Sequence, residues 1–186
     1  MDGCLIFGIV FLTQNSLKMT SFASVSDRFI AELERLPFNA SDATDAQENR
    51  RIELIIRAMR FLKLKLYPEA ALEETSEFLQ SLGKFFCQVK SIRVKHAYAE
   101  IFLELLLPLA GVAVAEVNHP NWVQGIETIF PRASKMATKP KHWLVAYPLM
   151  TALLCVSRRE FFLEHWMSII EGGFQKAKVW TITYQT

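Results

Sequence analysis

The side chains that could carry out chemistry are spread along the chain of 186 residues, and none falls into a known catalytic spacing. The four histidines, His96, His119, His142 and His165, stand singly, so a metal site would need the fold to bring ligands together. The sequence has no H-E-x-x-H, G-x-S-x-G, G-x-x-x-x-G-K, G-x-G-x-x-G or C-x-x-C motif. It therefore predicts a protein that is not an enzyme, with no catalytic residue, no cofactor and no metal ligand.

The cysteines also argue against catalysis. Cys87 and Cys155 lie within apolar stretches, where cysteine usually behaves as a small buried hydrophobe. A nucleophilic thiol needs electropositive and partly exposed surroundings that lower its pKa, and neither stretch supplies them. We therefore expect both side chains to be buried and unreactive. With Cys4 they make an odd number at wide spacing, which favours a reducing compartment such as the cytoplasm.

The strongest local charge is basic and lies on two stretches, 50–65 and 84–96. From these we select a candidate partner-binding patch that consists of Arg57, Arg60, Lys63, Arg93 and Lys95. Two interpretations stay open: a patch for an acidic partner or phosphate groups, and an ordinary solvated helix face. The acidic stretch from Glu69 to Glu77 is expected to neutralise part of this charge.

Overall composition excludes other classes of partner. The 21 Lys and Arg residues against 19 Asp and Glu give a net charge of +2, so no global field attracts nucleic acid or an anionic membrane. The apolar runs at 4–12, 105–115 and 143–156 all fall short of the roughly 18 residues that a membrane-spanning helix needs. The first run also has no preceding Lys or Arg, which argues against a signal peptide.

Apolar periodicity predicts helices throughout the central part of the chain. Residues recur at i, i+3 and i+4, and no stretch from 21 to 174 alternates long enough to indicate a half-buried strand. Turn residues and prolines separate about seven helices. The predicted ranges are 24–36, 46–66, 68–89, 92–117, 121–137, 141–156 and 157–173, with the last helix ending at Gly172 and Gly173.

The predicted fold class is all-α. A compact bundle and an α-solenoid segment of HEAT or armadillo-like helix pairs both fit seven helices. Internal Pro108, Pro131 and Pro148, and helices that are apolar all round, favour the solenoid, whose inner helices are covered by neighbouring repeats. We divide the chain into an atypical segment 1–20, a helical domain 21–174 and a disordered tail 175–186.

Several long and unusual stretches of the sequence resemble those of a known protein family. They include Ser24–Leu33 (SVSDRFIAEL), Ile56–Lys65 (IRAMRFLKLK), Arg93–Glu100 (RVKHAYAE), Ala115–Pro120 (AEVNHP) and Phe130–Ala133 (FPRA). In these strings and their order, over about residues 21–172, the chain resembles the N-terminal domain of the Furry family of cell morphogenesis proteins, particularly the fungal members. Residues 1–20 and 179–184 depart from the family pattern, as a fragment of a longer gene product would.

The resemblance implies a non-catalytic scaffold. Furry-like proteins are very large, are built of HEAT or armadillo-like repeats, and act with NDR-family kinases in polarised growth and cell morphogenesis. The implied partner is an NDR-family kinase complex, and the implied location is the cytoplasm and cortical sites of growth. The family supplies no catalytic residues. A solenoid segment without its neighbouring repeats is also expected to expose apolar end faces.

Two other classes of function remain as alternatives. A small helical ligand-binding or enzymatic bundle would need a deep pocket with converging titratable groups. A secreted or anchored helical protein would use the N-terminal apolar run and carry a glycan on Asn39, which begins an Asn-Ala-Ser triplet.

Overall fold

The chain folds into helices, and the prediction of an all-α protein is confirmed. The computed structural model describes residues 21–36, 46–112 and 117–183, with side chains up to Gly173. These ranges hold seven α-helices, two short 3-10 helices and no strand. The α-helices are α2 (Phe22–Glu34), α3 (Ala46–Ala58), α4 (Glu69–Gln88), α5 (Ile92–Ala110), α6 (Pro120–Ala137), α7 (Trp143–Cys155) and α8 (Arg159–Thr183), and the 3-10 helices are η1 (Met59–Phe61) and η2 (Pro140–His142).

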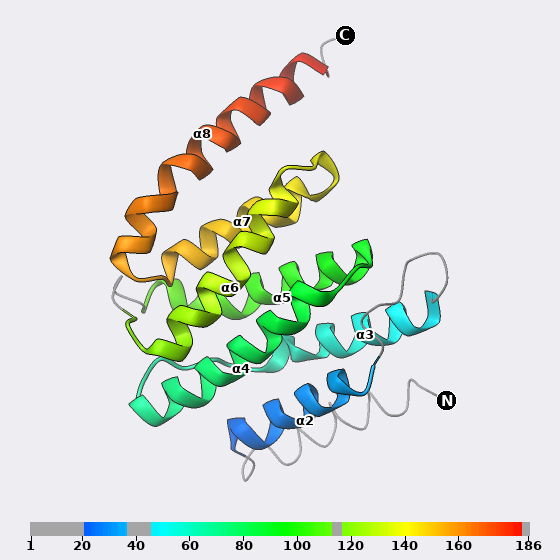
Figure 1. Cartoon of the computed structure of the whole chain (residues 1–186), viewed down its shortest axis with the longest axis vertical. Coiled ribbons are helices and arrows are strands. Elements are labelled where there is room, and N and C mark those ends of the chain that lie inside the picture. Colours follow the sequence, from blue (N-terminus) through cyan, green and yellow to red (C-terminus); the bar gives the residue numbers. More distant parts are fainter. Residues whose placement is uncertain (1–20, 37–45, 113–116, 184–186) are drawn as a thin grey trace.

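Alternate helices pack on one another, so the molecule has two layers (Figure 1). In one layer α2 packs on α4 and α4 on α6, while in the other α3 packs on α5 and α5 on α7. Helix α8 packs mainly on α7, and its Phe161 also meets Phe130 of α6 with ring centroids 5.1 Å apart. Stacking helices in two alternating layers is the arrangement of an α-solenoid segment.

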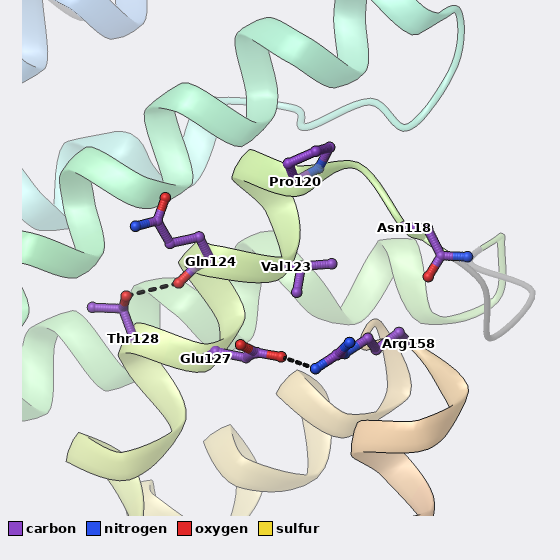
Figure 2. Close-up of a pocket in the computed structure, with 7 residues that line it drawn as sticks. All are labelled: Asn118, Pro120, Val123, Gln124, Glu127, Thr128 and Arg158. Atoms are coloured by element: carbon purple, nitrogen blue, oxygen red, sulfur yellow. Dashed lines mark hydrogen bonds and ion pairs between the residues drawn. The ribbon is translucent and has the colours of Figure 1, made fainter.

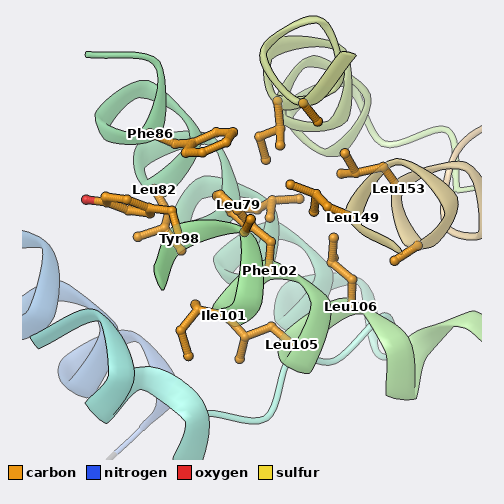
Figure 3. Packing of buried hydrophobic residues seen from close by; sticks show 14 of the residues in the cluster. Leu79, Leu82, Phe86, Tyr98, Ile101, Phe102, Leu105, Leu106, Leu149 and Leu153 are labelled. Carbon is orange, nitrogen blue, oxygen red and sulfur yellow. The ribbon is translucent and has the colours of Figure 1, made fainter. Parts of the chain in front are cut away.

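The core lies between the layers, where α4 faces α5 (Figure 3). Phe86 of α4 contacts Tyr98 and Phe102 of α5, with ring centroids 5.8 and 5.6 Å away, and all three side chains are fully buried. Further along the same face of α5, Leu106 is buried in the same cluster as Leu149 of α7. Each such side chain contributes about 1.5–3 kcal/mol through burial, so this face of α5 holds α4 and α7 to the core.

Two glycines let α4 and α6 approach each other closely. A Cβ atom added at Gly83 of α4 would lie 2.9 Å from Cγ1 of Ile129, and one at Gly125 of α6 would lie 3.4 Å from Leu79. Both glycines are buried within their helices. A larger residue at Gly83 would therefore push the two helices apart.

The predicted helix 46–66 ends early, which corrects the sequence analysis. It stops at Phe61, and residues 62–66 run extended with Leu64 and Leu66 buried and Lys63 and Lys65 exposed. The backbone N–H of Lys65 donates to Oγ1 of Thr75 at 3.2 Å. The sequence K-L-K-L at 63–66 alternates with period two, but Leu62 and Leu66 also continue the i, i+3, i+4 spacing of the preceding helix, which is why the sequence predicted a longer helix.

Helix α5 also differs from its prediction. It was expected to reach Val117 and to be buried nearly all round, yet it ends at Ala110, and residues 113–116 lie outside the described part. Leu107 is 60% exposed and Val112 is 53% exposed. One side of the C-terminal part of α5 therefore faces solvent.

At the C-terminal end, both the predicted helix stop at Gly172–Gly173 and the predicted disordered tail are wrong up to Thr183. Helix α8 continues through the glycines to Thr183. Neither glycine has the positive φ with which glycine ends a helix. Gly172 instead gives room for the side chain of Tyr147 in α7, whose hydroxyl would lie 3.1 Å from a Cβ at this position.

The close approach of α4 and α6 yields a stability prediction. Gly83→Leu should lower the free energy of unfolding by about 1–3 kcal/mol, because the new side chain has no room beside Ile129. Gly173→Leu is the matched control, since nothing lies within 4 Å of a Cβ there and leucine favours a helix. Urea denaturation of both variants measures this, and equal stability of the two would contradict the packing.

Candidate functional site

The fold brings the two halves of the predicted basic patch together. Arg57 lies on α3 and Arg60 on η1, while Arg93 lies in the first turn of α5. Because α3 packs on α5, the residues from both stretches share the outer surface of this layer. The sequence could not show this, since Arg57 and Arg93 are far apart along the chain.

Three glutamates pair with the arginines of the patch. Oε1 of Glu53 accepts from Nε of Arg57 at 3.1 Å, and its Oε2 accepts from Nη2 of Arg93 at 2.9 Å. Nη2 of Arg57 also lies 3.1 Å from Oε2 of Glu100. We call the resulting row of alternating charges the charged ladder; it consists of Arg93, Glu53, Arg57, Glu100, Arg60 and Glu104.

The glutamates that pair with the basic patch are not the ones that the sequence suggested. The stretch Glu69 to Glu77 was expected to neutralise part of the patch, but the ion pairs recorded for the arginines of the patch go to Glu53, Glu100 and Glu104. Glu53 is only 15% exposed and bridges two arginines that are more than half exposed. The ladder therefore joins α3 to α5 while its cations remain accessible.

The two lysines of the patch lie close in sequence to the ladder, Lys63 after Arg60 and Lys95 after Arg93. Lys63 is exposed on the extended segment after η1. Lys95 is half-buried, and its Nζ donates to the backbone carbonyl of Lys90 at 2.5 Å. Five basic residues thus stand with three glutamates, so the surface keeps an excess of positive charge.

A histidine pair lies beside this surface, and sequence reasoning missed it. Nε2 of His96 and Nδ1 of His142 are 2.7 Å apart, and they come from α5 and η2. The pKa of His142 is lowered to about 4, mainly by burial and in smaller part by the neighbouring His96 and by Lys141, Lys95 and Lys139. Burial also lowers the pKa of His96. Both rings are therefore neutral at pH 7.

Both cysteines are exposed, so the prediction that they are buried is wrong. The Sγ of Cys87 lies 3.6 Å from the carbonyl oxygen of Thr128 and is partly shielded from water. This desolvation raises the pKa of the Cys87 thiol, against a smaller lowering by Arg132. At pH 7 Cys87 is a protonated thiol, which is a poor nucleophile.

An open hollow of about 560 Å³ lies between the start of α6 and the start of α8 (Figure 2). Nη2 of Arg158 donates to Oε1 of Glu127 at 2.6 Å across it, and Oγ1 of Thr128 donates to the carbonyl oxygen of Gln124 at 2.7 Å. Its two charged side chains thus pair with each other.

The described residues contain neither a candidate metal-binding cluster nor a helix that could span a membrane. No three His, Cys, Asp or Glu side chains in this part of the chain gather closely enough to hold a metal ion. None of the helices there is both long enough and apolar enough to cross a bilayer.

The ladder predicts a salt-dependent contribution to stability. Glu53→Gln removes two ion pairs and should lower the free energy of unfolding by less than about 1 kcal/mol at low salt, because the arginines are exposed. High salt should shrink this difference. Glu73→Gln on α4, an exposed glutamate, is the control for the lost charge. Urea denaturation of both variants at two salt concentrations measures this. Equal changes in the free energy of unfolding for Glu53→Gln and Glu73→Gln would contradict the ladder.

The histidine pair predicts a pH dependence. Because the folded state holds the pKa of His142 near 4, below the ordinary value of 6.5, unfolding takes up a proton between these pH values. Stability should fall by about 1–3 kcal/mol as pH drops from 6.5 to 4. His142→Gln should flatten this slope, and an unchanged slope would contradict the assignment. Lys141→Gln should raise the pKa of His142 in an NMR titration.

Comparison with known proteins identifies the family. A family model described as "Cell morphogenesis N-terminal" matches residues 16–182. The chain is 39% identical to the cell morphogenesis protein PAG1 of Saccharomyces cerevisiae and 43% identical to the cell polarity protein mor2 of Schizosaccharomyces pombe. Each match spans 163 residues, which is 88% of this chain and 7% of the relative. No solved structure matches.

These matches confirm the resemblance that the sequence strings carried. The family model covers almost the whole helical part of the chain, from before α2 to the end of α8. The chain therefore belongs to the family of cell morphogenesis proteins, in the region that the model describes as N-terminal.

Proposed function

We propose that this chain is a non-catalytic scaffold segment that supports NDR-family kinase signalling in polarised growth and cell morphogenesis. The printed names of the two relatives, a morphogenesis protein and a polarity protein, support the process. The chain spans 7% of each relative, so the kinase partner and the action of the whole protein are part of the proposal. The cytoplasm and cortical growth sites are the proposed location.

The single observation that carries a binding role is the charged ladder with its two flanking lysines. Arg57 and Arg60 keep 51% and 59% of their side chains exposed although each has a carboxylate partner. Exposed ion pairs contribute little to stability, so an acidic partner surface can displace the glutamates at small cost. The proposed partner-binding patch consists of Arg57, Arg60, Lys63, Arg93 and Lys95, and the ion pairs through Glu53 that join Arg57 to Arg93 support it.

Removing charge from this patch tests the proposal. The triple variant Arg57→Gln, Arg60→Gln and Lys63→Gln should weaken capture of an NDR-family kinase by about tenfold or more, and high salt should weaken wild-type capture. Glutamine is preferred to glutamate because a carboxylate at position 57 would sit between Glu53 and Glu100.

The control is a triple variant of equal charge change on the other layer: Arg28→Gln on α2, Lys84→Gln on α4 and Lys135→Gln on α6, all exposed. It should bind as the wild type does, and both variants should melt cooperatively. Capture that is unaffected by the first triple variant would contradict the patch. A wild-type chain that captures no NDR-family kinase would contradict the proposed partner.

A further inference from the structure

The segment that connects η1 to α4 (Figure 1) alternates exposed and covered side chains. Lys63 and Lys65 are exposed, and the aromatic residues before and after them, Phe61 and Tyr67, are 60% and 71% exposed. The three leucines between these residues are half-buried or buried. The segment therefore presents two lysines between two aromatic side chains, and we call Phe61, Lys63, Lys65 and Tyr67 the docking strip.

The covered side of the segment fixes the docking strip on the core. Leu64 and Leu66 belong to the buried hydrophobic cluster. Between them, the backbone N–H of Lys65 donates to Oγ1 of Thr75, which is buried in α4. The strip is thus held in an extended form before a partner arrives, which lowers the entropy cost of binding.

The two lysines of the docking strip differ from the arginines of the charged ladder in their lack of acidic partners. Within the part of the chain that the structure describes, no ion pair or hydrogen bond involves the ammonium group of Lys63 or Lys65. Arg57 and Arg60, by contrast, each pair with a glutamate. A carboxylate that reaches the two lysines therefore displaces no partner.

The docking strip is not an end face of the helix array. Helix α4 packs on α2 and α6, and α3 packs on α2 and α5. Both helices that the strip joins therefore have neighbours on either side within this chain. Further repeats would extend the array beyond its end helices, so the exposure of the strip does not result from their absence.

We propose that the docking strip binds an extended acidic segment of a protein partner, in which two acidic residues at alternate positions lie between two apolar residues. In an extended chain, side chains on one side recur every second residue, about 6.6 Å apart. The pattern apolar-x-acidic-x-acidic-x-apolar therefore places carboxylates at Lys63 and Lys65 and apolar side chains at Phe61 and Tyr67. This inference deepens the proposed function, since Lys63 also belongs to the proposed partner-binding patch.

The arrangement favours a peptide over single-stranded nucleic acid, which also binds lysines and aromatic rings. Successive bases stack on rings that lie near one another, whereas Phe61 and Tyr67 stand at opposite ends of the strip with both lysines between them. One face of Phe61 is also covered by the guanidinium of Arg60, whose Cζ lies 5.8 Å from the ring centroid. The net charge of +2 supplies no field that attracts nucleic acid.

Fluorescence anisotropy of labelled peptides with the whole chain tests the proposal without a kinase. The peptide SLTETETLS carries the proposed pattern and reads the same in both directions, so it fits the strip in either orientation. The peptide SLTEETTLS has the same composition, but its adjacent glutamates point to opposite sides of an extended chain. The wild type should bind the first peptide a few-fold more tightly, and high salt should weaken this binding.

Variants of the lysines show whether the strip is the binding surface. Lys63→Gln with Lys65→Gln should weaken binding of SLTETETLS by a few-fold to about tenfold and remove the preference between the peptides. Lys84→Gln on α4 with Lys135→Gln on α6 is the control of equal charge change, and it should leave both unchanged. All four lysines are exposed, so both double variants should melt as the wild type does.

Equal binding of the two peptides by the wild type, or equal effects of the two double variants, would overturn the proposal. Tighter binding of a labelled oligouridylate than of SLTETETLS would overturn it in favour of nucleic acid. Discrimination between the peptides by a chain that captures no NDR-family kinase would support the docking strip and contradict only the proposed kinase partner.

Discussion

The structure depends on the way alternate helices stack, which the contact of α4 with α6 shows most clearly. Gly83 and Gly125 let these two helices meet at a distance that any side chain at position 83 would prevent. This contact fixes one layer, and α5 then fills the space between the layers with Phe102 and Leu106. Since α3 packs on α5, the position of the charged ladder follows from the same stacking.

Much of the fold could be predicted from the sequence because the apolar residues recur with the helical period. The sequence correctly indicated helices in the places of α2 to α8, and α6 was placed to within a residue. Helix ends were harder to predict, since they depend on contacts between distant segments. Leu62 and Leu66 continue the helical spacing, but the structure has no helix here and the backbone N–H of Lys65 bonds to Thr75 instead. Gly172 looked like a helix stop, yet it makes room for Tyr147.

The residue types of the candidate site could be predicted from the sequence, but the pairing of these residues in space could not. The sequence singled out the basic residues, but their partners lie on another helix, so Glu100 and Glu104 of α5 could not be assigned to Arg57 and Arg60. The His96–His142 contact joins residues from separate helices and leaves no local signal. By contrast, the family could be inferred from strings of sequence alone, because family likeness is carried by the order of residues and needs no geometry.

The central claim is that the α3–α5 surface is where this scaffold segment meets its partner. Hydrogen exchange of the chain, measured by mass spectrometry with and without an NDR-family kinase, tests it most directly. The account predicts slower exchange in α3, η1 and the first turns of α5 when the kinase is bound, with α2, α4 and α6 unchanged. Protection confined to α2, α4 and α6, or no protection anywhere, would contradict it.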